Sequence, residues 1–186
     1  MKIALVVLVC LVQLAVPASI IYSYEDTLSK GTEYRFKVRP VDPADPFRGR
    51  YVRLGFDEEN TRDRVIPMPG IESIPKKQRF AFASIAVGED GLAKVVAVTG
   101  APPQSGDYIK VKTTVYSNKL YRINFPFDRY YAEESKAPNI ENVVFNTRNL
   151  GEERLITAQV FINQGRGVIS ELYVDGQTIH DFLDEK

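Results

Sequence analysis

Two stretches of this sequence hold carboxylates, arginines and tyrosines close together, which are the residue types that could do chemistry. They are Asp42, Asp45, Arg48 and Tyr51 in the first stretch and Arg129, Tyr130 and Glu133 in the second. If the fold brings both stretches into one polar cleft, the carboxylates could bind a cation or act as acid and base. Aspartate before proline commonly caps a turn, however, and arginine beside tyrosine commonly packs on the ring. We favour this structural interpretation.

Neither a catalytic constellation nor a metal-binding pattern is evident in the sequence. His180 is the only histidine, and Asp181 beside it does not establish a catalytic pair, because a nucleophilic triad needs a serine or cysteine placed by a base. Ser84, Ser105 and Ser170 lie in no recognisable nucleophile motif. A metal site would need several histidines or an acidic cluster. We expect no catalytic residue, metal or cofactor, and we expect His180 on the surface.

The composition narrows the functional classes. With 186 residues, 44% of them hydrophobic and 26% charged, the chain can bury one core or two small adjoining ones. It has 24 basic and 24 acidic residues without a run of like charge, which argues against a nucleic-acid partner. Cys10 is the only cysteine, so the chain forms neither an internal disulfide nor a site with several thiolates.

The N-terminal segment predicts a membrane anchor. Residues 3–21 include no charged side chain, and a helix of that length spans about 28 Å, close to the roughly 30 Å hydrocarbon core of a bilayer. Lys2 precedes the segment, and Glu25 and Asp26 follow it, which favours an N-terminus inside. We therefore expect residues 1–24 to anchor the protein in a membrane. Residues 25–186 would form the exported domain of a single-pass protein.

A cleaved signal peptide is the alternative for this segment. Val16, Pro17 and Ala18 offer small residues at the usual cleavage positions, and the apolar region is short. In that case the domain would be secreted rather than anchored.

Residues 25–186 read as a mainly β domain. Tyr34, Phe36 and Val38 alternate with charged residues, as in a half-buried strand. The same period of two or an apolar run continues at 52–56, 80–87, 92–98, 109–115, 121–125, 155–162 and 168–174. Residues 89–91 offer hairpin-turn chemistry, and residues 57–77 indicate a surface loop. Apolar residues at helical spacing in 127–146 predict a short helix. We expect an antiparallel β-sandwich or partial barrel with one or two short helices.

The segment 41–56, VDPADPFRGRYVRLGF, resembles the signature of the GDYXXLXY family. The resemblance extends to the apolar N-terminus, to residues 127–137 and to residues 167–176. Members of this family are bacterial membrane-anchored proteins of unknown function. The resemblance therefore implies a location and an architecture, and it brings no activity, cofactor or substrate.

The chain departs from the family signature at two positions. Gly49, Tyr51 and Leu54 keep their places, whereas Arg50 stands where the family name has aspartate and Phe56 where it has tyrosine. We therefore expect no role here that requires an acid at the second position of the motif.

Together these features predict a non-enzymatic, membrane-anchored envelope protein. We expect its exported domain, in the bacterial periplasm or at the cell surface, to contact a partner, another membrane protein, through the loop in residues 41–56. The candidate surface residues are Asp42, Asp45, Arg48, Gly49, Tyr51, Leu54, Arg129, Tyr130 and Glu133.

Two alternatives remain open. The first is an exported hydrolase that uses Asp42 or Asp45 with Glu133, and it requires these carboxylates to lie within about 10 Å of each other. The second is a glycan-binding module, which requires exposed, coplanar tyrosine rings beside the motif.

Overall fold

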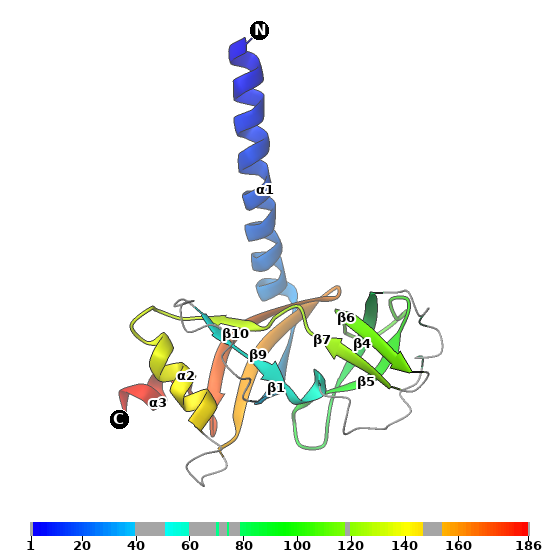
Figure 1. Cartoon of the computed structure of the whole chain (residues 1–186), viewed down its shortest axis with the longest axis vertical. Helices are drawn as coiled ribbons and strands as arrows, with labels where there is room; N and C mark the ends of the chain where they lie inside the picture. Colours follow the sequence, from blue (N-terminus) through cyan, green and yellow to red (C-terminus); the bar gives the residue numbers. More distant parts are fainter. Residues whose placement is uncertain are drawn as a thin grey trace.

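The computed structural model describes residues 2–39, 51–59, 70, 74, 79–117, 120–146 and 154–185. In that part of the chain a long helix, α1 (Lys2–Lys30), stands on a body built mainly of strands (Figure 1). The strands form antiparallel sheets that curve around a shared core as a half-barrel, with a few short helices beside them. The predicted mainly β fold is therefore confirmed.

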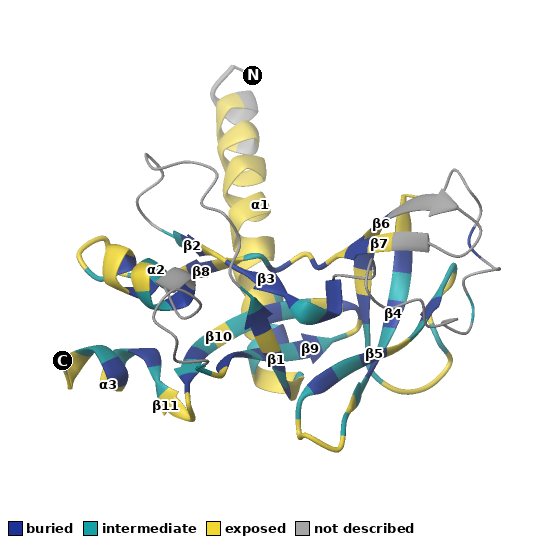
Figure 2. Cartoon of the chain, turned by 60° about the horizontal axis from the view of Figure 1, so that its bottom comes forward, coloured by how far each residue is buried: buried dark blue, intermediate teal, exposed yellow. Residues whose placement is uncertain are grey.

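Most of α1 projects away from the body and exposes apolar side chains (Figure 2). Each of the following is at least 47% exposed: Val6, Val7, Val9, Leu11, Val12, Leu14, Val16, Ile20 and Ile21. Within the residues that the structure describes, no helix combines the length and the apolarity needed to cross a membrane. The N-terminal helix predicted from the sequence is present, but its membrane-spanning role gains no support from this finding.

The C-terminal end of α1 is fixed to the body. The N–H of Gly31 donates to the carbonyl of Thr27 at 2.9 Å and ends the helix, and Thr27 itself is 1% exposed. The side-chain amide of Asn163 donates to Asp26 at 3.3 Å, and Arg166 hydrogen-bonds Ser23. The helix thus runs beyond the predicted anchor boundary at residue 24, and its last turns pack on the domain.

Among the described residues, five antiparallel strands form the sheet that carries α1, in the order β11-β10-β9-β1-β3. Their bounds are β1 (Thr32–Arg39), β3 (Gly55–Phe56), β9 (Ile156–Asn163), β10 (Arg166–Val174) and β11 (Gln177–Thr178). In β1 the alternating Tyr34, Phe36 and Val38 are buried, as their spacing predicts.

A second sheet has the order β5-β4-β6-β7 in the described part of the chain. Its strands are β4 (Phe80–Val87), β5 (Ala93–Thr99), β6 (Tyr108–Ser117) and β7 (Leu120–Asn124). The predicted hairpin joins β4 to β5, and Gly91 in its turn has φ +74°, a conformation that glycine adopts readily.

A short ribbon pairs β2 (Tyr51–Arg53) with β8 (Arg129–Tyr131). Helix α2 (Ala137–Asn146) confirms the helix predicted after residue 127, and α3 (Ile179–Asp184) packs Ile179 and Phe182 against the body. Thr178 caps α3 by accepting a hydrogen bond from the N–H of Asp181.

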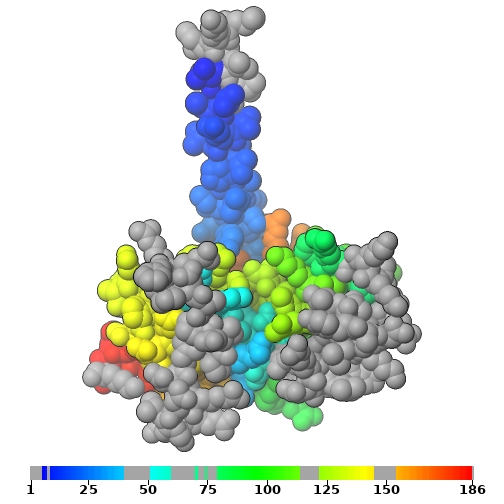
Figure 3. Space-filling model, in the orientation of Figure 1, coloured from blue at the N-terminus to red at the C-terminus, as the bar shows by residue number. Residues whose placement is uncertain are grey.

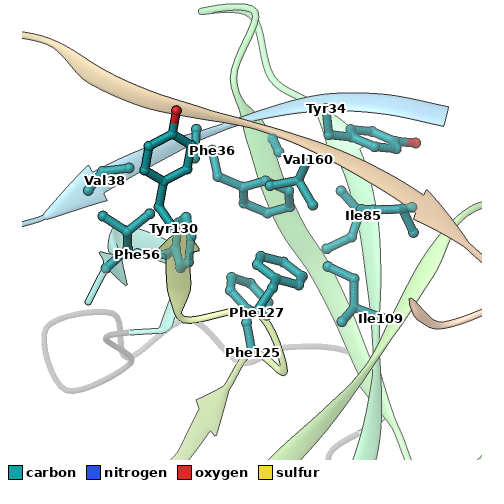
Figure 4. Close-up of a cluster of buried hydrophobic side chains, with 14 of the residues drawn as sticks. Tyr34, Phe36, Val38, Phe56, Ile85, Ile109, Phe125, Phe127, Tyr130 and Val160 are labelled. Atoms are coloured by element: carbon teal, nitrogen blue, oxygen red, sulfur yellow. The ribbon is translucent and has the colours of Figure 1, made fainter. Parts of the chain in front are cut away.

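Four phenylalanines occupy the centre of the core (Figure 4). Phe36, Phe56, Phe125 and Phe127 come from four separate positions along the fold, and all their ring centroids lie 5.1–5.9 Å apart. Each ring is at most 6% exposed. This aromatic cluster joins the two sheets, because β1 and β3 belong to one and Phe125 directly follows β7 of the other.

Two sequence-based expectations around the motif need correction. Residues 52–56 do not form one strand, because the chain changes partners at Leu54: β2 pairs with β8, whereas β3 pairs with β1. Residues 57–77 were expected to be a surface loop, but Asp57–Glu59 forms a 3₁₀ helix, η1, with Glu58 and Glu59 buried. Most of residues 60–77 lie outside the described part of the chain.

Candidate functional site

The pairing of β2 with β8 brings the motif and the second polar stretch together. Tyr51 lies opposite Tyr131, Val52 opposite Tyr130, and Arg53 opposite Arg129. Because side chains alternate across a strand, Val52 and Tyr130 point into the core and the other two pairs point outward. We call Tyr51, Arg53, Arg129 and Tyr131 the outer face of the ribbon.

Aromatic and guanidinium groups cover this outer face. The Arg129 guanidinium lies 4.8 Å from the centroid of the Tyr51 ring, and the Tyr51 and Tyr131 rings are 6.0 Å apart with their planes at 59°. A hydrogen bond with Tyr131, with Tyr51 and Asp128 nearby, raises the pKa of Arg129. Asp128 lies 3.7 Å from the Nε atoms of both Arg53 and Arg129. The face is therefore aromatic and cationic.

The remaining predicted surface residues have different positions. Leu54 is 2% exposed, and its N–H donates to the carbonyl of Asp128 at 2.9 Å, so it is a core residue that fixes the ribbon. Tyr130 is also buried, at 7%. Glu133 is exposed in the turn before α2. Asp42, Asp45, Arg48 and Gly49 lie outside the described residues, as does Arg50.

Tyr130, Glu171 and His180 form a cluster that the sequence does not indicate. The Tyr130 hydroxyl donates to Glu171 at 2.8 Å and lies 3.5 Å from Nε2 of His180. Burial, followed by the bond to Glu171, raises the pKa of Tyr130. The expected surface position of His180 is wrong: the residue is half-buried, and its Nδ1 is buried without a hydrogen-bond partner among the described residues. The docking of α3 places it there.

Glu58 and Glu59 form a second feature that sequence reasoning missed. Glu59 accepts hydrogen bonds from the N–H of Phe125 at 2.6 Å and of Phe56 at 3.3 Å, and Glu58 accepts one from Val95 at 2.9 Å. Burial raises the pKa of Glu59, although both backbone donors and the charge of Arg39 oppose that shift. These carboxylates connect the two sheets. The only hint in the sequence is their position directly after an apolar strand.

The described residues of the site offer groups suited to binding. No group of three or more histidine, cysteine, aspartate or glutamate side chains that could hold a metal ion occurs among them. The outer face of the ribbon has stacking and cationic groups, which recognise aromatic, acidic or phosphate-bearing partners.

Comparison with known proteins identifies one family. The family model described as GDYXXLXY protein matches residues 13–172, which include β1 to β9 and most of β10. No curated protein and no solved structure matches the chain.

Proposed function

The chain belongs to the GDYXXLXY protein family, and we propose that it is a non-enzymatic, membrane-anchored protein of the bacterial cell envelope. In this proposal α1 holds the protein in the membrane. The β-rich domain lies on the extracytoplasmic side and uses the outer face of the ribbon to bind a partner, which is another membrane protein.

The character of α1 supports the anchor. Its N-terminal part has no charged residue between Ile3 and Ile21, and its apolar side chains stand clear of the body (Figure 3). Exposed apolar surface of this kind is costly in water and stable in hydrocarbon. Cleavage after the apolar segment would instead release the domain, and the intact mass of the mature protein distinguishes the two cases.

The observation that carries the binding role is the stacked outer face. Tyr131 is 66% exposed, and Arg129 lies over the neighbouring Tyr51 ring. Tyrosine and arginine are enriched at the energetic centres of protein interfaces because they offer large contact areas with few freely rotating bonds. Pre-stacking reduces the conformational entropy that binding would cost. A domain anchored in a membrane most often encounters proteins of the same membrane, which favours a membrane protein as the partner.

A photo-cross-linking experiment tests the partner. A photoreactive phenylalanine derivative replaces Tyr131 in the full chain, in its native membrane, and adducts are analysed after extraction in mild detergent. The control places the same probe at Val87, which is 61% exposed at the end of β4 in the other sheet. We expect a discrete protein adduct at position 131 alone.

A substitution completes this test. Tyr131→Ala should reduce capture of the partner at least about tenfold, because truncation of a hot-spot tyrosine at an interface costs about 2 kcal/mol or more. The proposal is contradicted if the probe at position 131 forms no protein adduct, or if the probes at positions 131 and 87 form the same adducts.

The geometry favours a protein partner over a glycan. Stacking on a sugar requires coplanar rings beside the motif, and the Tyr51 and Tyr131 planes meet at 59°. For the hydrolase alternative, Asp42 and Asp45 lie outside the described residues, so their distance to Glu133 remains a matter of prediction.

A further inference from the structure

A cavity of about 890 Å³ lies where α1 meets the body. Its walls come from α1, from β2, β4, β6, β7 and β8, from the segment between β7 and β8, and from the first half of β10. In Figure 1 the hairpin between β9 and β10 lies beside the foot of α1, in agreement with the hydrogen bond from Arg166 to Ser23. The cavity therefore opens close to the point where the helix leaves the domain.

The lining of this cavity is strongly basic. It includes one acidic side chain, Asp128, and five basic ones: Arg53, Lys110, Lys112, Arg129 and Arg166. The whole chain has as many acidic as basic residues, so this excess of positive charge is a local feature. Asp128 lies 3.7 Å from each of two arginines and offsets only part of it. We call this site the basic cavity.

The two lysines are available to a ligand. Lys110 and Lys112 are exposed on alternate positions of β6, and the ammonium of Lys110 lies 5.1 Å from the centroid of the Phe80 ring. Lys112 forms no ion pair with the residues that the structure describes. The cavity is also lined by the apolar side chains of Phe125, Phe127 and Val168. Cationic and apolar groups in the lining of one cavity fit an amphiphile with an anionic head.

The position of Tyr24 on α1 indicates how far the basic cavity would lie from the hydrocarbon core of the membrane. Tyr24 lines the cavity and comes three residues after Ile21, the end of the uncharged segment. At the rise of a helix it lies about 4.5 Å further along the axis. The headgroup layer of a bilayer is roughly 5–8 Å thick on each side. Tyr22 and Tyr24 are both exposed, as tyrosines at a membrane interface often are.

We infer that the basic cavity binds the phosphate group of an anionic lipid headgroup. This inference rests on the proposed membrane anchor, because α1 brings the cavity to headgroup depth. Lysine and arginine attract anionic lipids within a Debye length of the surface, and the arginine fork can bind phosphate through two hydrogen bonds. The domain would thus be held close to the membrane plane by a second, headgroup-specific contact.

Native mass spectrometry of the full chain in detergent tests this inference. Phosphatidylglycerol, zwitterionic phosphatidylcholine and soluble pyrophosphate are titrated separately, and bound molecules are counted. The test variant is Lys110→Glu with Lys112→Glu, which leaves the outer face of the ribbon intact. The charge-matched control is Lys37→Glu with Lys136→Glu, since neither residue lines the cavity.

We expect phosphatidylglycerol to bind wild type and control alike, and to bind the test variant at least about tenfold more weakly. Equal binding by all three proteins, equal binding of both lipids, or pyrophosphate binding as tight as phosphatidylglycerol binding would overturn the inference. Incorporation into pure phosphatidylcholine vesicles that resists alkaline carbonate reports on α1 alone. Failure of the anchor is therefore distinguishable from failure of the cavity.

Discussion

At the scale of single residues, Glu59 connects the two sheets through hydrogen bonds. Its carboxylate accepts the N–H groups of Phe56 and Phe125, which belong to the aromatic cluster. Those two donors come from segments that are far apart in the sequence. An acid therefore satisfies buried backbone groups that neither sheet can satisfy alone.

The raised pKa of Glu59 predicts how the stability of the protein depends on pH. The Glu59 carboxyl keeps its proton to a higher pH in the native state than in the unfolded chain. Protonation of Glu59 therefore adds to the free energy of unfolding at low pH, and this addition is lost as the pH rises through the native pKa. Glu59→Gln removes that titration. We expect the stability of wild type relative to Glu59→Gln to fall as the pH rises above about 4.3, the ordinary pKa of a glutamate. Urea unfolding of the full chain in mild detergent measures it.

Asp90→Asn is the matched control for this prediction. The pKa of Asp90 is lowered by its bond with Lys94 and by the N–H of Leu92, so its stabilising contribution is present above the unfolded pKa and is lost as pH falls. The stability of wild type relative to Asp90→Asn should therefore rise with pH, and the change should be small because the Asp90–Lys94 pair is exposed. A difference between wild type and Glu59→Gln that does not vary with pH would contradict the assignment.

At the scale of elements, strand periodicity explains what the sequence could predict. The alternation in β1, and the apolar runs of β4, β5, β9 and β10, identified those strands because one face of each is buried. The turn at residues 89–91 identified the hairpin. Such local patterns depend only on neighbours in the chain, so they are visible without a structure.

The split at Leu54 and the buried acids of η1 could not be predicted in this way. Leu54 changes the partner strand because its N–H bonds to Asp128, and Glu59 is held by Phe125, both of which are distant in sequence. At the candidate site, the sequence offered the convergence of the two polar stretches only as one possibility, and the pairing of β2 with β8 brings Tyr51 opposite Tyr131. Which of their residues face outward follows from the register, and this placed Leu54 and Tyr130 in the core.

Packing between β10 and the segment before β8 yields a second prediction. A Cβ atom at Gly167 would lie 2.3 Å from a ring carbon of Phe127, within the aromatic cluster. The ring is enclosed by three other phenylalanines and has little room to move. We therefore expect Gly167→Ala to lower the free energy of unfolding by about 1–3 kcal/mol. Denaturant unfolding measures the loss.

Gly88→Ala serves as the control for this substitution. Its Cβ would meet the side chains of Asp90 and Lys94, whose ends can move aside, so a smaller loss is expected. Adding Phe127→Leu to Gly167→Ala should restore part of the stability relative to the sum of the single changes. Equal losses for both alanine variants, or strict additivity in the double variant, would argue against a steric origin.

At the scale of the whole molecule, the apolar part of α1 leads to the basic cavity. Tyr22 and Tyr24 are exposed near the end of the helix, and Tyr24 lines the cavity. The outer face of the ribbon shares Arg53, Arg129 and Tyr131 with that cavity. In the proposed arrangement, a headgroup in the cavity and a partner on the ribbon would therefore influence each other through the same arginines.

The orientation of the molecule can be tested with its only cysteine. Cys10 lies in the apolar part of α1 and is exposed on the isolated chain. If α1 is inserted, the surrounding lipid keeps a water-soluble reagent away from the Cys10 thiol. A membrane-impermeant maleimide should then label Cys10 only after detergent dissolves the membrane.

A second labelling experiment uses Glu134→Cys on a Cys10→Ala background, because Glu134 is exposed in the turn before α2. We expect this variant to be labelled in intact cells, from the outer side of the cytoplasmic membrane. Labelling of Cys10 in intact membranes would refute insertion, and labelling of Glu134→Cys only after lysis would place the domain on the opposite side.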